Sequence, residues 1–153
     1  MDDQASAPRA EIRAPTLQAG SPEPMAIAFE AKLPGTPLGV RMLRHRMAQI
    51  AADCGMDQDA IADVQLAVSE AATNAVMHAY ADAPGELAVT AAIRDSELEI
   101  VIGDTGSGLT DRPDSPGIGV GLPLIATVAA RLRIITHSGG TEIHMAFPCP
   151  GAG

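Results

Sequence analysis

A carboxylate and a carboxamide stand four residues apart in the segment QLAVSEAATNAVMHAY, as Glu70 and Asn74. At this spacing, two side chains of a helix share one face. The amide oxygen is a hard, neutral ligand that suits Mg²⁺, and the carboxylate can accept a proton from a nucleophile. The pair therefore indicates magnesium-assisted chemistry, although two polar residues on a solvated helix face would have the same spacing.

A second acid, Asp104, closely follows an apolar run that ends at Ile102, in the segment VIGDTGSGL. A carboxylate at the end of a strand can accept a hydrogen bond from an exocyclic amine. The glycines after it, Gly106 and Gly108, allow the backbone to close over a flat ligand. An Asp-Thr-Gly turn that leaves a strand is the alternative interpretation of the same residues.

Three glycines, Gly117, Gly119 and Gly121, lead into an apolar segment in GIGVGLPLIATVAA. Backbone N–H groups at the start of a helix bind phosphate, and glycines permit its close approach. The segment is not a Walker A loop, because Gly-Lys-Ser/Thr is absent. It is not a dinucleotide fingerprint either, because it does not follow a strand in a βαβ unit. A flexible loop ahead of a helix is the alternative.

The spacing of apolar residues predicts the elements that must position these groups. Alternation over 25–30 predicts a half-buried strand. Thr36 is expected to cap a helix over 37–53, which has proline at its first position and stops at Gly55. Helical spacing then continues over 57–79, with Asp57 as the expected cap.

The second half of the chain reads as strands around one more helix. The pattern predicts strands over 87–93 and 98–102, which are joined at Asp95-Ser96, and irregular structure over 103–119. It then predicts a helix over 120–130 with Pro123 in its first turn. The last two predicted strands, 132–136 and 142–147, are joined at Ser138-Gly139-Gly140. Short turns between neighbouring strands favour an α+β fold. We expect a two-layer α/β sandwich, with a mostly antiparallel mixed sheet and helices on one face.

Composition narrows the classes of function. The chain has 153 residues, a net charge of −9, one Tyr, two Phe and no Trp. It therefore lacks the basic patch and exposed rings with which proteins bind nucleic acids directly. No segment has the roughly 20 apolar residues of a membrane span, so we expect a cytoplasmic protein. Two distant cysteines, Cys54 and Cys149, indicate neither a metal cluster nor a disulfide framework. The proline-containing residues 1–24 are expected to be a disordered tail.

The three motifs and their order resemble the Bergerat-fold ATP-binding family of gyrase, Hsp90, MutL and histidine kinases. The order is a helix with ExxxN, a strand followed by DxGxG, GxGxG leading into a helix, and Gly140-Thr141 opening the last strand. Residues 66–80 and the compact size resemble most the bacterial anti-sigma factor serine kinases of the SpoIIAB and RsbW type. The resemblance covers 25–148 as one kinase domain, which leaves 149–153 as a C-terminal tail.

The resemblance implies a role for each motif residue in binding ATP and Mg²⁺. Glu70 would be the general base, and Asn74 would ligate Mg²⁺. Asp104 would accept a hydrogen bond from the adenine amino group, assisted by Thr141. The remaining nucleotide-binding residues would shape the adenine pocket or close over the phosphates: Gly106, Gly108, Gly117, Gly119, Gly121 and Leu122. Residues 109–116 would form a short lid over the nucleotide.

The resemblance also implies protein partners. Such kinases hold a sigma factor and phosphorylate a serine on an anti-anti-sigma partner with a STAS fold, usually as homodimers. Arg41 falls where the family has a partner-contacting arginine, although Arg44 and Arg46 lie on the same expected helix and a solvated basic face is the alternative. Two other functions fit the motifs, namely a non-catalytic ATP-binding module that sequesters a partner and the catalytic subunit of a split histidine kinase.

Overall fold

The computed structural model describes residues 26–79, 85–104, 118–137 and 140–152. The elements are β1 (Ala26–Pro34), α1 (Pro37–Asp53), α2 (Gln58–Ala79), β2 (Glu86–Arg94), β3 (Glu97–Asp104), α3 (Ile118–Val128), β4 (Arg131–His137), β5 (Gly140–Pro148) and a 3-10 turn, η1 (Pro150–Ala152). The expected tail over 1–24 and the expected lid over 109–116 lie outside the described residues.

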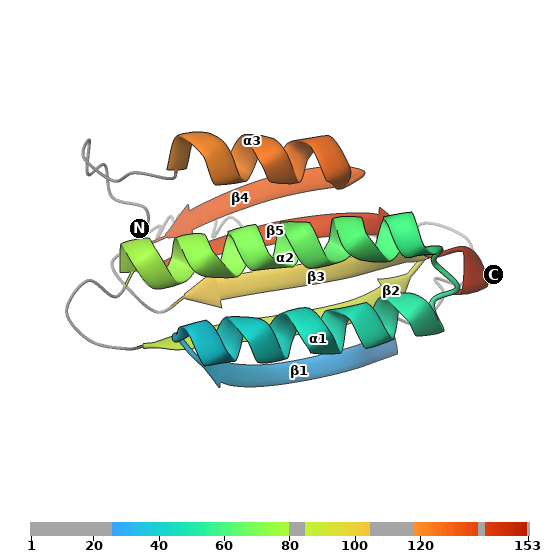
Figure 1. Cartoon of the computed structure of the whole chain (residues 1–153), viewed down its shortest axis with the longest axis horizontal. Helices are drawn as coiled ribbons and strands as arrows, with labels where there is room; N and C mark the ends of the chain where they lie inside the picture. The colour runs from blue at the N-terminus through green and yellow to red at the C-terminus, as the bar shows by residue number, and fades with distance from the viewer. Residues whose placement is uncertain (1–25, 80–84, 105–117, 138–139, 153) are drawn as a thin grey trace, which may run out of the picture.

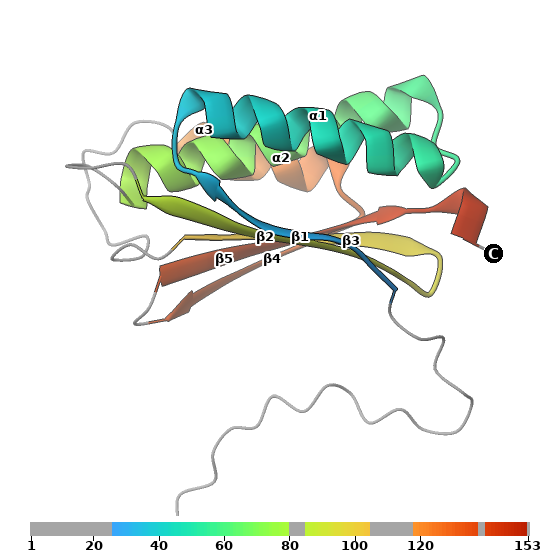
Figure 2. The same ribbon diagram turned by 90° about the horizontal axis from the view of Figure 1, so that it is seen from below.

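The strands form one sheet in the order β1-β2-β3-β5-β4, and every described pair of neighbours is antiparallel. The three helices lie side by side on one face of this sheet (Figure 1). Seen along the sheet, the helices and the strands form two layers, and the described helices leave the second face of the sheet uncovered (Figure 2). This arrangement confirms the α+β sandwich expected from the sequence.

Local signals in the sequence mark the helix boundaries. The Thr36 side chain accepts a hydrogen bond from the Gly39 N–H at 3.2 Å, and proline stands at the first helical position of α1. Gly55 follows the end of α1 with a φ of +80°, a left-handed conformation that glycine adopts without strain. The Asp57 carboxylate accepts from the Ala60 N–H at 2.8 Å at the start of α2. The three predicted signals are confirmed.

Helix α3 differs from its prediction. It begins at Ile118, before the expected residue 120, and ends at Val128. Pro123 therefore lies inside the helix rather than in its first turn. Glycine-rich segments predict a loop, so the sequence predicts the start of this helix two residues later than the structure shows it.

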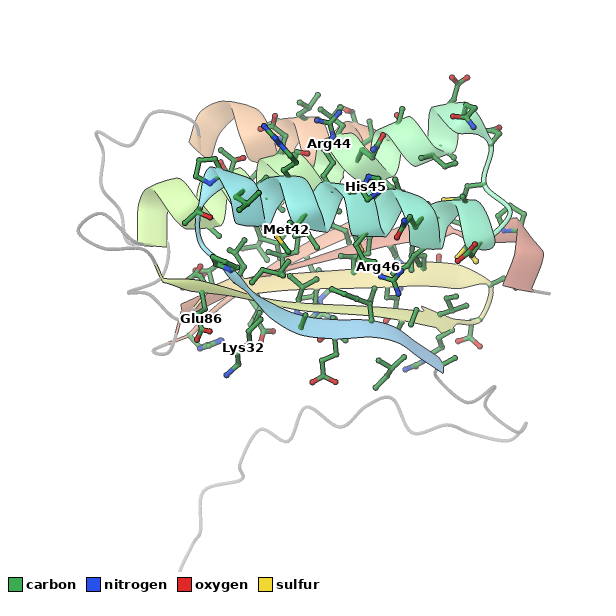
Figure 3. The ribbon with its side chains drawn as sticks, turned by 60° about the horizontal axis from the view of Figure 1, so that its bottom comes forward. Lys32, Met42, Arg44, His45, Arg46 and Glu86 are labelled. Carbon is green, nitrogen blue, oxygen red and sulfur yellow. The ribbon has the colours of Figure 1, made fainter. Side chains whose placement is uncertain are left out.

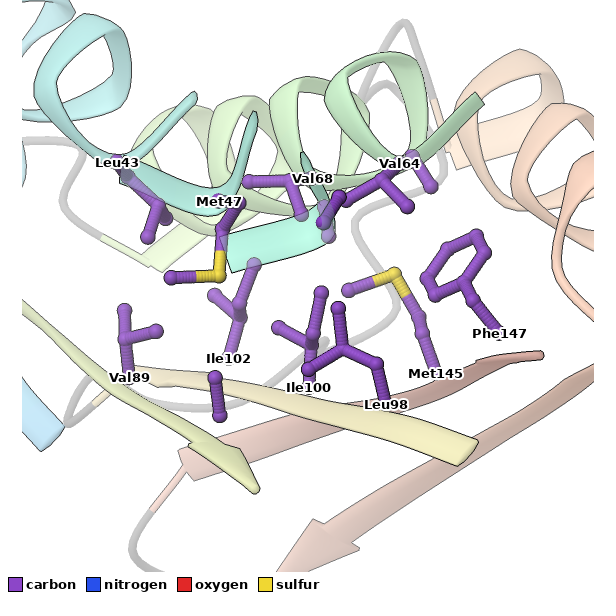
Figure 4. Close-up of a cluster of buried hydrophobic side chains, with 14 of the residues drawn as sticks. Leu43, Met47, Val64, Val68, Val89, Leu98, Ile100, Ile102, Met145 and Phe147 are labelled. Carbon is purple, nitrogen blue, oxygen red and sulfur yellow. The ribbon is translucent and has the colours of Figure 1, made fainter. Parts of the chain in front are cut away.

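The core lies between the helices and the sheet and is built from aliphatic side chains, methionines and one phenylalanine (Figure 4). Helix α2 packs against α1 on one side and against α3 on the other. It is therefore buried on its flanks as well as on the face toward the sheet. The largest core side chains come from both layers and include Leu43, Met47, Val64, Val68, Val89, Leu98, Ile100, Ile102, Met145 and Phe147.

The central position of α2 fixes how its polar residues are exposed. A side chain on the flank toward α3 is covered by that helix, although it lies off the main apolar stripe of α2.

None of the helices in the described ranges is long and apolar enough to cross a membrane.

Candidate active site

Asn74 is buried on α2, with only 6% of its surface exposed. Its Nδ2 atom has no hydrogen-bond partner within the described part of the chain. Burying an amide N–H without a partner costs about 1–3 kcal/mol, so such a group in a folded protein calls for an explanation. The alternative of a solvated polar face is therefore wrong for Asn74, while Glu70, one turn earlier, is half-buried.

The first turns of α3 lie against this pair. A Cβ added to Gly121 would lie 2.7 Å from the Asn74 Nδ2, 3.1 Å from its Oδ1 and 3.2 Å from the Glu70 Oε2. Only glycine leaves room for the two side chains at this point. Gly119 lies one half-turn earlier on α3, whereas Gly117 is outside the described residues. The structure thus brings the ExxxN motif and the end of the GxGxG motif together.

Asp104 ends β3, beside the first residues of β5. Gly140 has a φ of +138°, and a Cβ on it would overlap the Asp104 carbonyl oxygen and lie 3.0 Å from the Asp104 Oδ1. This glycine was predicted as part of a hairpin turn and as the residue before Thr141 at the start of the last strand, and it allows β5 to start against Asp104. Thr141 follows it and is 3% exposed. The expected pair of Asp104 and Thr141 therefore occupies one corner of the sheet.

A pocket joins these two groups of residues. It is lined by Asn74, Ala75, Ile102, Asp104, Leu122, Thr141 and Ile143. Ile102 and Ile143 stand directly opposite each other on β3 and β5 and form an apolar wall between the polar ends. Four of these seven residues, namely Asn74, Asp104, Leu122 and Thr141, were predicted as site residues.

The sequence analysis missed Ala75, Ile102 and Ile143. The alternation of side chains along a strand could have identified the two isoleucines as lining residues. Ile102 precedes Asp104 by two residues, and Ile143 follows Thr141 by two residues. Side chains two apart on a strand point to the same face. The glycines Gly106 and Gly108 lie outside the described residues, and Arg41 is not among the residues that line the pocket.

The donor set fits a nucleotide better than a metal held by the protein alone. The described residues contain no group of three or more His, Cys, Asp or Glu side chains that could hold a metal ion. Mg²⁺ in proteins typically keeps few protein ligands and completes its shell with waters and substrate phosphates. The Asn74 amide has an oxygen for such an ion and an unpartnered N–H for a phosphate oxygen.

The uncovered face of the sheet holds another hollow, over β3, β5 and β4. It is lined in part by Glu99, Arg131, Arg133 and His144. Arg131 forms ion pairs there with Glu97 and with Glu99. Because this hollow opens on the face opposite the helices, it does not contain Glu70 or Asn74.

Comparison with known families and sequences gives consistent results. Residues 33–147 match the family described as the histidine kinase-like ATPase domain. The chain is 34% identical over 129 residues to the serine-protein kinase RsbW of Bacillus licheniformis, covering 74% of this chain and 81% of that protein. It is 32% identical over 130 residues to the protein of the same name from Bacillus thuringiensis (strain Al Hakam), covering 75% and 81%.

Solved structures agree with this match. The RsbU and RsbW domains of Rv1364c from Mycobacterium tuberculosis align with a TM-score of 0.63 and 26% identity, over 82% of this chain and 32% of that chain. The histidine kinase domain of a blue-light activated histidine kinase from Erythrobacter litoralis aligns with a TM-score of 0.53 and 20% identity, over 72% of this chain and 61% of that chain. The second likeness concerns the fold alone.

Proposed function

The chain belongs to the histidine kinase-like ATPase family, and within it to the group of the RsbW serine-protein kinases, and from this premise we propose that it transfers the γ-phosphate of ATP to a serine of a protein partner. One observation carries the proposal. The start of α3 packs on Glu70 and on Asn74, whose Nδ2 has no hydrogen-bond partner among the described residues, so that a carboxylate, an amide and a helix N-terminus meet at one point.

The pocket binds the adenine ring of ATP in this proposal. The Asp104 carboxylate accepts a hydrogen bond from the exocyclic amine, and Thr141 lies beside it in the buried corner. Ile102 and Ile143 contact the apolar faces of the ring, and Leu122 closes the pocket from α3. An apolar wall and a few polar groups at fixed places are typical of small-ligand sites. The cavity between these side chains is about 10 Å³, so the pocket widens when the ring binds in this proposal.

The phosphates extend from the adenine pocket toward Asn74 and the start of α3. A bound Mg²⁺ would supply positive charge that offsets the negative charge of the phosphates. The Asn74 amide oxygen is its protein ligand in this proposal. The backbone N–H groups of the first turn of α3 stabilise negative charge further, and the glycines Gly117, Gly119 and Gly121 let the phosphates approach them. Gly106 and Gly108 shape the chain after Asp104.

Glu70 acts as the general base. Its carboxylate accepts the proton of the attacking serine hydroxyl, the serine oxygen bonds to the γ-phosphorus, and ADP leaves. The packing of Gly121 supports this role, because it holds the Glu70 carboxylate beside Asn74 and therefore beside the phosphates. A module that only binds ATP has no use for a base at this position.

The partners that we propose are a sigma factor and a STAS-fold anti-anti-sigma protein that carries the acceptor serine. Helix α1 offers a surface for them that combines exposed apolar and basic side chains. Leu38 is 60% exposed and Met42 is 48% exposed, and Arg41 lies next to Met42. Figure 3 shows Arg44 on the side of α1 toward α2 and Arg46 on the side toward the sheet.

Of the arginines of α1, we propose Arg41 for partner contact. Arg46 lies over the Phe29 ring, 5.6 Å from its centroid, and therefore serves packing within the chain. We further propose a cytoplasmic homodimer, as in the family that the sequence resembles.

The test is a phosphotransfer assay with labelled ATP, Mg²⁺ and STAS proteins from the same genome. We expect label on a partner serine with the wild-type chain and its loss with Glu70→Gln, which keeps the size of the side chain but cannot accept the proton. Asp104→Asn should lose nucleotide binding itself. Tight ATP binding without transfer to any partner would favour the non-catalytic module, and label on a histidine would favour the split histidine kinase.

A further inference from the structure

The two cysteines of the chain lie together, although 95 positions separate them in the sequence. Both are free thiols, with 2% of Cys54 and 1% of Cys149 exposed. The Cys149 Sγ lies 3.7 Å from the Cys54 carbonyl oxygen, and the two thiols are close enough for Cys149 to contribute to the raised pKa of Cys54. The sequence analysis did not pair them, because nothing in their spacing indicates contact.

Backbone contacts hold the two cysteines in this position. The Cys149 N–H donates to the Ser96 carbonyl at 2.7 Å, and the Gly151 N–H donates to the Cys54 carbonyl at 2.7 Å. A Cβ on Gly151 would lie 2.7 Å from the same carbonyl oxygen, so the turn η1 passes very close to the end of α1. Both views show the red C-terminal turn beside the junction of α1 and α2 (Figures 1 and 2).

We propose that Cys54 and Cys149 form a reversible redox pair, which a peroxide oxidises to a disulfide that fastens the end of α1 to the end of β5. The proposal concerns the end of the sheet away from the pocket. It does not depend on the proposed kinase activity, and its test can fail or succeed without it.

The chemistry balances with hydrogen peroxide as the oxidant. The Cys149 sulfur gives up its proton as it attacks one peroxide oxygen, the O–O bond breaks, and a sulfenic acid forms while the other oxygen leaves with that proton as water. The Cys54 sulfur then attacks the Cys149 sulfur, the S–S bond forms, and the sulfenic hydroxyl leaves with the Cys54 proton as a second water. The two thiols lose two electrons in total, and the peroxide gains them.

The surroundings assign the two roles. Burial, and then the hydrogen bond with Cys149, raise the pKa of the Cys54 thiol to about 12, so Cys54 keeps its proton and is the poorer nucleophile for the first step. In the second step this proton passes to the departing sulfenic hydroxyl as the Cys54 sulfur attacks. Cys149 stands between the last paired residue of β5 and η1, which covers it. Short segments of this kind open locally at lower free energy than the core does, and lifting η1 exposes Cys149 to the peroxide.

The direct test uses the full wild-type chain, treated with hydrogen peroxide and then alkylated under denaturing conditions. We expect a protease digest to contain a peptide pair joined through Cys54 and Cys149, and dithiothreitol to restore two alkylatable thiols. A disulfide that closes a loop of this length should raise the midpoint of thermal unfolding by about 5–10 °C, reversibly. This experiment needs no variant and therefore cannot fail through misfolding.

Two variants make the test specific. Cys149→Ser and Cys54→Ser should each abolish both the joined peptides and the peroxide-dependent rise in the unfolding midpoint. Two alkylatable thiols in the peroxide-treated wild-type chain would overturn the proposal. So would disulfides that join two copies of the chain, or peroxide products that stop at sulfinic or sulfonic acid.

Discussion

The two ends of the sheet differ in whether their buried polar groups have hydrogen-bond partners among the described residues. At the end where β3 stops and β5 starts, the buried Asn74 amide has an N–H without a partner in the described residues, beside a pocket. At the other end, the Cys149 thiol lies 3.7 Å from the Cys54 carbonyl oxygen, and the same carbonyl accepts from the Gly151 N–H at 2.7 Å. We call these the pocket end and the thiol end.

Close packing serves a different purpose at each end of the sheet. Glycines permit close contact at both ends, since Gly121 and Gly140 lie against side chains or backbone at the pocket end and Gly151 does so at the thiol end. A paired contact stabilises the fold, whereas a buried unpaired group costs stability unless a ligand supplies its partner. The pocket end therefore has the features of a binding site, and the thiol end has those of a structural junction.

The largest expected effect comes from Gly140→Ala at the pocket end. The φ of +138° is strained for any residue with a Cβ, and the new Cβ would overlap the Asp104 carbonyl oxygen. We expect the free energy of unfolding to fall by about 3 kcal/mol or more, measured by urea denaturation.

Gly103→Ala is the matched control for that substitution, because it lies on the neighbouring strand in the same corner. Its Cβ would meet the Glu142 Cγ at 3.4 Å, an ordinary contact. Its free energy of unfolding should stay within about 1 kcal/mol of the wild type. Equal losses in the two variants would show that close approach at Gly140 is not what holds Asp104 in place.

The second prediction concerns Asn74→Leu, which replaces the unpartnered amide with an apolar group of similar size. The free energy of unfolding should rise by about 1 kcal/mol, since the cost of the buried N–H disappears. Nucleotide binding, measured by calorimetry with ATP and Mg²⁺, should be lost in the same variant. A gain in stability together with a loss of binding is expected of a site residue but not of a core residue.

Ala72→Ser is the control for this prediction. Ala72 is fully buried on the same helix, and the substitution adds a buried hydroxyl there, so it should lower stability. If Asn74→Leu instead lost 2 kcal/mol or more, the amide would have a partner in the free protein, and the contrast between the two ends would not hold.

The sequence predicted the local parts of this fold well. The caps at Thr36 and Asp57 involve atoms within three residues of each other, so their signals are complete in a short segment. Asn74 is indicated by its four-residue spacing from Glu70 on a predicted helix, and Asp104 by its position just after a predicted strand. Their joint position in one pocket followed from the resemblance, and no single spacing contained it.

What the sequence could not give depends on contacts between distant segments. The burial of Asn74 results from the packing of α3 against α2, whereas the spacing of Glu70 and Asn74 alone is equally compatible with a solvated helix face. The meeting of Cys54 and Cys149 requires the end of α1 and the end of β5 to lie at the same edge of the molecule. No short segment of the sequence indicates either contact, so both are seen only in the folded structure.

The smallest expected effect lies at the thiol end and appears only at high pH. Burial and the hydrogen bond with Cys149 raise the Cys54 pKa from 9.0 to about 12 in the folded chain. Between these values the unfolded chain loses the thiol proton and the folded chain keeps it. The unfolded state then binds fewer protons, so the free energy of unfolding falls as the pH rises. The stability linked to this thiol is complete below about pH 9 and is lost as the pH approaches 12.

Urea denaturation at about pH 8 and about pH 10 measures this effect. The wild-type chain should lose about 1 kcal/mol more between the two conditions than Cys54→Ala does, because the variant has no thiol to titrate at this position. The peroxide-oxidised wild type should behave like the variant, since a disulfide has no proton to lose. An equal pH dependence in the reduced wild type and in Cys54→Ala would mean that Cys54 reaches solvent in the folded chain, and the thiol end would then not be the closed junction that its contacts with Cys149 and Gly151 indicate.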